Sequence, residues 1–238
     1  MVSKLFFIKA LTNMHPGSGD IDYNIVDNQV QRDVITGYPI IQSSSLKGSL
    51  RNFFEYTFGI DSNIVKTVFG ESGIQGTYKF LNANLLGIPV RSNQSQFFIG
   101  LCPEIIDQFI DMTEELSVNI NEDLIESLEG LKRYAKKDMP VVVDDSIEKE
   151  DIEDIYVEDY KACVEKCTGI ENVINLISGG NGSKKTNICV FDNDNFNEII
   201  KRLPIVARNH LENGESKNLW FEEIVPRESR FYFTIITD

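Results

Sequence analysis

The decisive stretch of this chain is Ile40-Ile41-Gln42-Ser43-Ser44-Ser45-Leu46-Lys47-Gly48-Ser49-Leu50-Arg51, a loop of small hydroxyl residues that runs into a helix. Ser44 or Ser45 can cap the first exposed amides of that helix. Apolar residues then recur at helical spacing as far as Phe58, and Gly59 is a suitable stop. The pattern therefore predicts a helix over residues 44–58 with one apolar face.

Lys47 and Arg51 lie one helical turn apart on another face of the predicted helix. The nearby N-terminus already carries free N–H groups and positive partial charge, so the arrangement suits a phosphate. Gly48 removes a side chain where a nucleic-acid backbone could approach closely. Helices with a serine cap and cations on the solvent side are also common without any ligand, so this stretch alone leaves both interpretations open.

Charge is distributed unevenly along the 238 residues, which carry a net charge of −14. Residues 1–102 hold eight Lys/Arg and seven Asp/Glu, whereas residues 103–238 hold 15 and 30. The first part is free to meet a polyanion, and the acidic part should face away from it, face a basic protein partner, or simply be solvated. The sequence contains no membrane-spanning run and no signal peptide, and the four cysteines lack zinc-site spacing, so a cytoplasmic location is expected.

The order of predicted elements indicates an α+β protein with a ferredoxin-like (RRM-like) core, a large helical and acidic insertion and a thumb-like hairpin. We expect one domain over residues 1–238, with its core at about 1–102 and 204–238 and the insertion at about 103–203. Asn213-Gly214 is a strong hairpin signal. Strands are predicted at 4–11 (well buried), 78–91, 96–100, 141–143, 155–157 and 231–237. Helices are predicted from 103, at 122–135, at 160–177 and, capped by Asp192 or Asp194, to about 203. Loops are predicted at 20–39 and 61–76.

The loop after the first predicted strand holds several candidate site residues. Gly17 and Gly19 on either side of Ser18 could let backbone amides turn toward a phosphate, although one Gly-Ser-Gly is a weak signal. His15 could act as a general acid or base, or anchor the loop. Long irregular segments in compact domains are often functional, and this one continues with four carboxylates and one arginine. These residues are Asp20, Asp22, Asp27, Asp33 and Arg32.

Several of these segments together resemble the RAMP superfamily, and within it the backbone subunits of type III-B CRISPR (Cmr) effector complexes. Their order and spacing agree over about forty residues at the start of the chain, and the resemblance resumes in two later segments. The early segments are Met14-His15-Pro16-Gly17-Ser18-Gly19, Val26-Asp27-Asn28-Gln29-Val30-Gln31-Arg32, Thr36-Gly37-Tyr38-Pro39-Ile40 and Ser45-Leu46-Lys47-Gly48-Ser49-Leu50-Arg51, and the later ones are Leu86-Gly87-Ile88-Pro89-Val90-Arg91-Ser92 and Leu219-Trp220-Phe221-Glu222-Glu223-Ile224-Val225-Pro226.

The resemblance implies a subunit that polymerises along a CRISPR guide RNA, with a ferredoxin-like palm and a thumb that kinks the guide. It further implies cleavage of a complementary target RNA with Mg²⁺ or a similar divalent cation. The implied partners are other copies of the chain and other Cmr subunits, and no association with a membrane is expected. The cleaving and metal-holding carboxylate corresponds to Asp27, and His15 ranks below it. The implied guide contacts are Ser44, Ser45, Lys47, Gly48 and Arg51, with Gly17, Ser18 and Arg32 as further RNA contacts.

Two departures from the family pattern stand out. Family members usually carry a Gly-rich loop and a further helix and strand at the C-terminus, so this part of the core is expected to be missing or supplied by another chain. The acidic balance is also unusual for a protein that binds guide RNA.

Other functions remain open at this stage. The chain could bind guide RNA without cutting, process the guide with His15 or His210, or bind a small phosphate ligand at the Gly-Ser-Gly loop. Without the resemblance, Asp27 could equally be a loop acid that bonds its own backbone.

Overall fold

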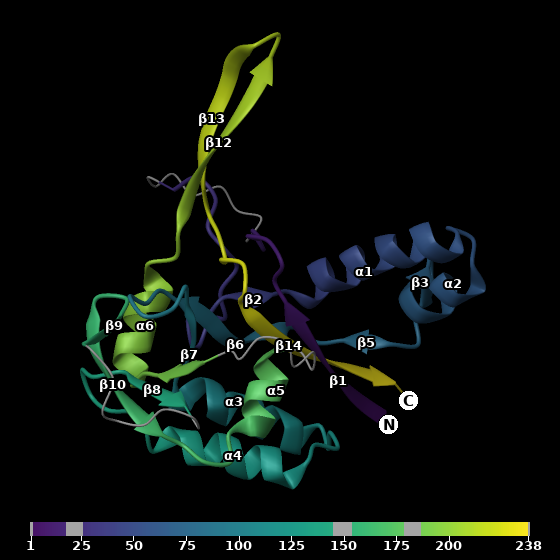
Figure 1. Ribbon diagram of the computed structural model, residues 1–238. Coiled ribbons are helices and arrows are strands. Elements are labelled where there is room, and N and C mark those ends of the chain that lie inside the picture. Colours follow the sequence, from purple (N-terminus) through teal and green to yellow (C-terminus); the bar gives the residue numbers. More distant parts are fainter. Residues whose placement is uncertain (1, 18–25, 145–153, 179–186, 238) are drawn as a thin grey trace.

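The protein is a mixed α+β structure built on one large sheet, which confirms the predicted α+β class. The computed structural model describes residues 2–17, 26–144, 154–178 and 187–237. Ser18, Gly19, Asp20 and Asp22 lie outside these residues. Figure 1 shows a compact body from which a long hairpin and a helical arm project in different directions.

The ten-stranded sheet runs in the order β1-β14-β6-β7-β11-β8-β10-β9, with β2 added beside β6 and β5 beside β14. The last strand therefore lies inside the sheet, where it pairs antiparallel with both β1 and β6. The strands of this sheet are β1 (Val2–Lys9), β2 (Ile40–Ile41), β5 (Lys79–Phe80), β6 (Ala83–Val90), β7 (Phe98–Leu101), β8 (Val141–Asp144), β9 (Ile155–Val157), β10 (Tyr160–Lys166), β11 (Ile188–Val190) and β14 (Arg230–Thr237).

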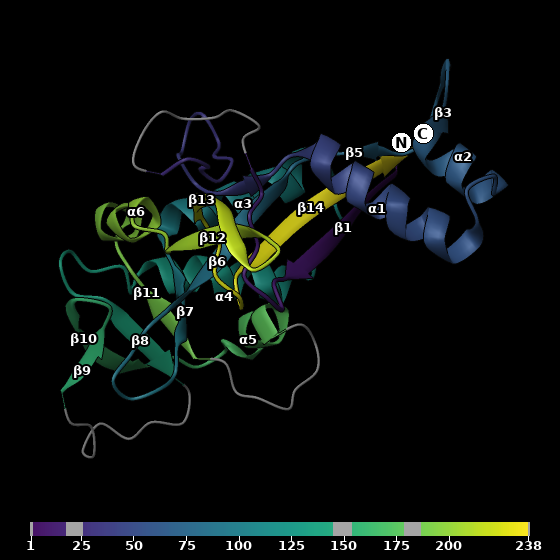
Figure 2. The same cartoon turned by 90° about the horizontal axis from the view of Figure 1, so that it is seen from above.

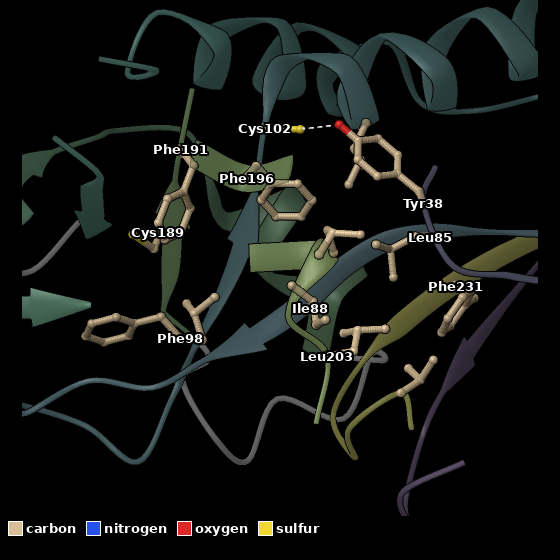
Figure 3. Close-up of a cluster of buried hydrophobic side chains, with 14 of the residues drawn as sticks. Tyr38, Leu85, Ile88, Phe98, Cys102, Cys189, Phe191, Phe196, Leu203 and Phe231 are labelled. Atoms are coloured by element: carbon tan, nitrogen blue, oxygen red, sulfur yellow. Dashed lines mark hydrogen bonds between the residues drawn. The ribbon is translucent and has the colours of Figure 1, made fainter. Parts of the chain in front are cut away.

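Helices cover the sheet and create two hydrophobic cores. One core packs α3, α4 and α5 against the sheet through residues such as Phe109, Leu131 and Ile177. The other combines the sheet with α6, the start of α1 and the loop before β2. Figure 3 shows part of this second core, in which Tyr38 and Phe196 meet edge to face and the Tyr38 hydroxyl lies 3.5 Å from the Cys102 sulfur. The helices are α1 (Ser43–Phe58), α2 (Asn63–Phe69), α3 (Pro103–Glu115), α4 (Glu122–Lys132), α5 (Glu171–Ser178) and α6 (Asn193–Lys201).

Two elements project from the body. The hairpin of β12 (Ile205–Glu212) and β13 (Glu215–Glu223) extends far above the sheet in Figure 1, and Asn213 and Gly214 both have positive φ, as the turn signal predicted. The second projection is the arm of α1, α2 and the short hairpin β3 (Gly70–Glu71) and β4 (Ile74–Gln75), which Figure 2 shows reaching away from the sheet.

Several predicted elements are confirmed and others are wrong. Asp192 caps α6 by accepting a hydrogen bond from the Asn195 amide, as expected. Residues 160–177 form a strand followed by a helix, because Tyr160–Lys166 pairs with β8 and β9 and tertiary pairing overrides helical spacing. Residues 61–76 hold α2 and a small hairpin where a loop was predicted.

The burial pattern also differs from the predicted one. β1 is half exposed along its length, although its apolar sequence predicted a buried strand. α1 begins at Ser43 after Gln42, and no side chain caps it, so the predicted serine cap is wrong. Leu46 alone is buried in α1, and Phe53 is 61% exposed, because most of the helix extends beyond the sheet. None of the helices in the described parts of the chain is long and apolar enough to cross a membrane.

Candidate nucleic-acid interface

Three segments that are far apart in the sequence meet at the root of the β12–β13 hairpin. Met14 bridges to Val225, Gly17 bridges to Val30, and Asn28 runs parallel to Glu222 at the end of β13. The Gln31 amide also donates to the Pro16 carbonyl. The loop after β1, the irregular segment 26–39 and the hairpin root therefore form one backbone-bonded unit.

Asp27 is held against the hairpin by its side chain. Its Oδ2 accepts a hydrogen bond of 2.8 Å from the backbone amide of Phe221, and the neighbouring Asn28 amide donates to the Phe221 carbonyl at 3.2 Å. The described residues give no hydrogen bond to the other carboxylate oxygen. Asp27 is therefore fixed in position by one oxygen, and the described residues leave its other oxygen without a hydrogen bond.

His15 lies in the same unit, where its ring contacts both Glu223 and Gly17. Its Nδ1 donates to the Glu223 carbonyl at 2.7 Å, so in the neutral ring the proton sits on Nδ1 and Nε2 is the acceptor. Gly17 packs directly against this ring, because a Cβ on Gly17 would lie 2.9 Å from Nε2. The close approach explains why a glycine stands at this position. His15 therefore anchors the loop, and a catalytic role for it stays a prediction.

The buried carboxylate of Glu223 organises the unit from inside. Its Oε1 lies 2.6 Å from the Arg32 guanidinium, and its Oε2 accepts from the Val30 amide at 3.0 Å. Arg32 also donates to the Gly37 and Ile200 carbonyls. Only 24% of the Arg32 side chain is exposed, and only 10% of the Glu223 side chain. Arg32 thus joins the segment 26–39, the hairpin and α6. Its guanidinium already donates to three acceptors within the chain, so a predicted contact with RNA would have to form beside these bonds.

Glu222 and Trp220 form a polar pair on β13 that was not predicted as part of the site. The Trp220 indole N–H donates to Glu222 at 2.7 Å, and Arg208 on β12 donates to its other oxygen at 3.0 Å. The indole hydrogen bond and the Arg208 cation lower the pKa of the Glu222 carboxyl, while partial burial opposes them. The alternation of positions 220 and 222 along a predicted strand was the available signal, because both side chains then lie on one face.

The predicted phosphate-binding helix lies on the other projection. Arg51 pairs with Glu55 one turn later at 2.7 Å and also donates to the Gly70 carbonyl, so it links α1 to α2. A Cβ on Gly48 would meet nothing within 4 Å, so packing inside the chain does not require a glycine there. The Ser43 amide donates to Asn82. The remaining predicted contacts, Ser44, Ser45 and Lys47, are exposed or half-buried on the first turns of the helix.

The predicted site residues therefore fall into two groups. His15, Gly17, Asp27 and Arg32 gather at the hairpin root, whereas the predicted guide contacts lie on α1. Among the residues that the structure describes, no three His, Cys, Asp or Glu side chains form a cluster that could hold a metal ion. His210, the alternative histidine, is exposed on β12 and lies 3.7 Å from Glu212.

The chain belongs to the RAMP superfamily, whose family model matches residues 7–238. Its sequence is 27% identical to the CRISPR system Cmr endoribonuclease Cmr4 of Pyrococcus furiosus over 256 residues, which covers 99% of this chain and 82% of that protein. Its fold matches a cryo-EM structure of the Type III-B Cmr-beta bound to cognate target RNA, with a TM-score of 0.77, 23% identity and coverage of 100% of this chain and 85% of the other. It also matches a crystal structure of oligomeric Cmr4 from Pyrococcus furiosus, with a TM-score of 0.67, 20% identity and coverage of 99% and 81%.

Replacing Arg32 with alanine should lower the free energy of unfolding by about 3 kcal/mol, because Glu223 would keep a buried charge without its partner. Urea unfolding followed by circular dichroism measures this change. Arg202→Ala is the matched control, since Arg202 at the C-terminal end of α6 has a side chain that is 72% exposed and pairs with Glu198 at 3.7 Å. Its effect should stay below about 0.5 kcal/mol. An Arg32→Ala protein of normal stability with weakened RNA binding would instead favour the predicted RNA contact.

The hairpin root should loosen in acid as Glu222 takes up a proton. A carboxyl whose pKa is lower in the folded state stabilises the fold at pH values above its unfolded pKa, about 4.3, and this contribution disappears as the pH falls through the folded pKa. Trp220 is the chain's one tryptophan, so its fluorescence reports the event directly. We expect a fluorescence transition below pH about 4.3 that is absent from Glu222→Gln and retained in Glu215→Gln. A midpoint pH of the fluorescence transition above the pKa of an ordinary glutamate would contradict the assignment of the transition to Glu222.

Proposed function

We propose that this chain is a backbone subunit of a type III-B CRISPR effector complex, which binds guide RNA in several copies and cuts complementary target RNA at Asp27. The observation that carries the proposal is the fixed carboxylate of Asp27 at the hairpin root, in a chain that aligns over nearly its full length with a Cmr endoribonuclease. The relatives solved with target RNA and as an oligomer support RNA and further copies as partners. Other Cmr subunits and a cytoplasmic location belong to the same proposal.

In this proposal the hairpin acts as the thumb that bends the RNA. Cutting RNA requires the 2′-hydroxyl to lie in line with the neighbouring phosphorus, and holding a kinked strand provides that alignment. Asp27 stands where the projecting hairpin joins the body, so it would meet the strand at the kink, where its free oxygen could accept the proton of the 2′-hydroxyl. The 2′-oxygen would bond to the phosphorus as the bond from the phosphorus to the 5′-oxygen breaks, and the leaving 5′-oxygen would take up a proton from water. Its hydrogen bond to the Phe221 amide would keep the carboxylate on the hairpin as the hairpin engages RNA.

Magnesium fits this site only in part. Glu222 and Glu223 lie nearby, but their carboxylates already bind Trp220, Arg208 and Arg32, which leaves Asp27 as the available ligand among the described residues. Mg²⁺ keeps most of its water and is commonly held by one or two carboxylates together with substrate phosphates. A divalent ion bound in this way would supply positive charge at the scissile phosphate. With one oxygen bonded to the Phe221 amide, Asp27 would use the other either to hold such an ion or to accept the proton of the 2′-hydroxyl.

We further infer that the palm is ferredoxin-like. β1, β14 and β6 are adjacent and antiparallel in that order, and α1 lies between β1 and β6 in the sequence. This is the arrangement expected for the first three strands and the first helix of a ferredoxin-like fold, with β6 second and β14 third in the chain. The expectation that the further helix and strand of this fold are missing stays a prediction.

A binding subunit that does not cut is the second candidate. The hydrogen bond from Phe221 to Asp27 favours it, because a loop acid with a purely structural function would make the same contact.

Replacing Asp27 with asparagine separates these two candidates. The amide oxygen of asparagine can still accept the Phe221 hydrogen bond, so the loop should keep its structure while the negative charge is lost. Cutting of a complementary target by the assembled complex should fall at least about a hundredfold, and chelation of divalent ions should abolish it. Guide binding should persist. Asp27→Ala, which also loses the hydrogen bond, is the control for a structural effect. Full cutting by Asp27→Asn would place the chemistry elsewhere.

Charge reversal at Lys47 and Arg51 tests the guide-binding helix. Lys47→Glu with Arg51→Glu should weaken binding equally for all RNA sequences, because phosphate contacts carry no base information. The log–log slope of affinity against salt should also fall by about one to two. Because Arg51 also bonds Glu55 and Gly70, the single change Lys47→Glu controls for damage to the arm. An unchanged slope in a folded double variant would contradict the assignment.

A further inference from the structure

A hollow of about 890 Å³ lies beside the root of the β12–β13 hairpin. Both ends of the hairpin reach it, because Pro204 directly precedes β12 and Pro226 follows shortly after β13. Most of the other walls come from the end of α6, the end of β6 and the turns before β10 and β14. Figure 1 shows α6 leading into β12 at the side of the body from which the hairpin projects. The volume lies in the range of about 300–1,000 Å³ that is usual for small-molecule sites.

Part of the lining is apolar and rigid. Three of the lining residues are prolines, Pro89, Pro204 and Pro226, which present a closed ring and no backbone N–H. The half-buried ring of Tyr160 is also in the lining, and it meets Phe191 edge to face with 6.1 Å between the ring centroids. This contact holds the Tyr160 ring against the core. A nucleobase is a flat ligand that packs well against a fixed aromatic ring.

Several charges in the lining are already paired within the chain. The Arg91 guanidinium lies 2.6 Å from the Glu158 carboxylate, which also accepts a hydrogen bond from the Arg91 amide. Glu228 pairs with Lys9 at 2.8 Å and with Arg230 at 3.2 Å. These groups therefore form the walls of the hollow and contribute little net charge to it.

Two other arginines remain available. Arg227 is exposed, and none of the described residues forms an ion pair with it. Arg202 has a side chain that is 72% exposed and lies 3.7 Å from Glu198, whose other oxygen pairs with Lys201 at 2.9 Å. Against these two cations stands Asp159, which likewise has no ion pair within the described residues. The available groups of the lining are thus two guanidinium groups and one carboxylate.

The charged groups lie close to the aromatic ring. Burial raises the pKa of the Tyr160 hydroxyl, and the positive charge of Arg202 opposes this effect. The negative charge of Asp159 raises the pKa of the same hydroxyl further. A cation and an anion therefore both act on the outer end of the ring, so one small ligand can reach all three side chains.

Arg227 is held at the hollow by its backbone. Its amide donates to the side chain of Asn13 at 2.9 Å, and the amide of Glu228 donates to the Ala10 carbonyl at 2.7 Å. Asn13 and Arg227 both line the hollow. The turn is fixed while the guanidinium stays exposed, so this cation can orient toward an anionic group.

We propose that this hollow binds a nucleotide, with its base against the Tyr160 ring and its phosphate at Arg202 and Arg227. A guanidinium donates two parallel hydrogen bonds to a phosphate, which makes arginine well suited to this contact. Asp159 accepts hydrogen bonds from ribose hydroxyls or from an exocyclic amine. The nucleotide is either a free mononucleotide or one unit of an RNA strand that passes the hairpin root. The proposal does not depend on cutting at Asp27, which does not line the hollow.

Isothermal titration calorimetry of the full chain with adenosine 5′-monophosphate (AMP), in buffer without divalent ions, tests the site. We expect saturable binding of one AMP per chain with a Kd below about 1 mM, which weakens as salt rises from about 0.05 M to about 0.3 M. Adenosine lacks the phosphate and inorganic phosphate lacks the base, so each should bind at least about tenfold more weakly than AMP.

Variants separate the two halves of the lining. The double variant Arg202→Gln, Arg227→Gln should bind AMP at least about tenfold more weakly. Its matched control is Lys161→Gln, Lys217→Gln, which removes two cations that are 63% and 46% exposed and do not line the hollow, and which should leave binding unchanged. Tyr160→Leu should weaken binding at least about fivefold, and Tyr160→Phe, which restores an aromatic ring, should recover most of the affinity.

A short RNA with hydroxyl groups at both ends distinguishes the two sources of the nucleotide. All its phosphates are internal, so displacement of AMP by this RNA would identify one unit of a strand as the ligand. AMP that the RNA does not displace would identify a free mononucleotide.

Three results would overturn the proposal. The first is a lack of saturable AMP binding. The second is equal weakening by the lysine control, which would indicate unspecific attraction of an anion. The third is inorganic phosphate that binds as tightly as AMP, because the base would then contribute nothing. No RNA is cut in this titration, so its result is independent of the chemistry proposed for Asp27.

Discussion

The structure of the candidate site depends on one buried ion pair, Arg32 with Glu223. A buried carboxylate is strongly destabilising unless a cation and hydrogen-bond donors surround it. Glu223 has both, from the Arg32 guanidinium and the Val30 amide, and its own carbonyl holds His15. Through these contacts a loop near residue 15 and an irregular segment near residue 30 keep fixed positions against the root of the β12–β13 hairpin. The position of Asp27 follows from this arrangement, because its partner Phe221 lies two residues before Glu223.

The molecule separates its charges spatially. The hairpin root and α1 are the elements proposed to meet RNA, and they belong to sequence regions that are near neutral or carry paired charges. The acidic excess lies in the insertion, and α3 collects part of it on one face beside the sheet. A net charge of −14 is therefore compatible with RNA binding, because a polyanion responds to the local field within about a Debye length and not to the total charge.

Local sequence patterns correctly predicted the structural features that depend on neighbouring residues. The helix after Ile41, the Asp192 cap, the Asn213-Gly214 turn and the apolar strands near residues 85 and 233 all have short-range causes, and the structure confirms them. The prediction of a helix over residues 160–177 failed for the opposite reason, because pairing with Val141–Asp144 and Ile155–Val157 determines the conformation of Tyr160–Lys166. Apolar spacing in α1 predicted an apolar face, but whether such a face is buried depends on where the helix lies relative to the sheet, and most of α1 extends past it.

The sequence by itself determined the fold class, the thumb-like hairpin and the short motifs that mark the RAMP superfamily, because these follow from periodicity, turn chemistry and residue order. Only the tertiary structure decided what the candidate side chains do. It showed that Arg32 is enclosed by Glu223 and two carbonyls, that Gly17 makes room for His15, and that Trp220 and Glu222 form a pair beside them. The contacts that bring the segments together join residues far apart in the sequence, with separations of 191 positions for Arg32 and Glu223 and 208 for His15 and Glu223. No local sequence pattern predicts contacts between residues so far apart. They form only when β14 pairs with β1 and brings the end of the chain beside its beginning.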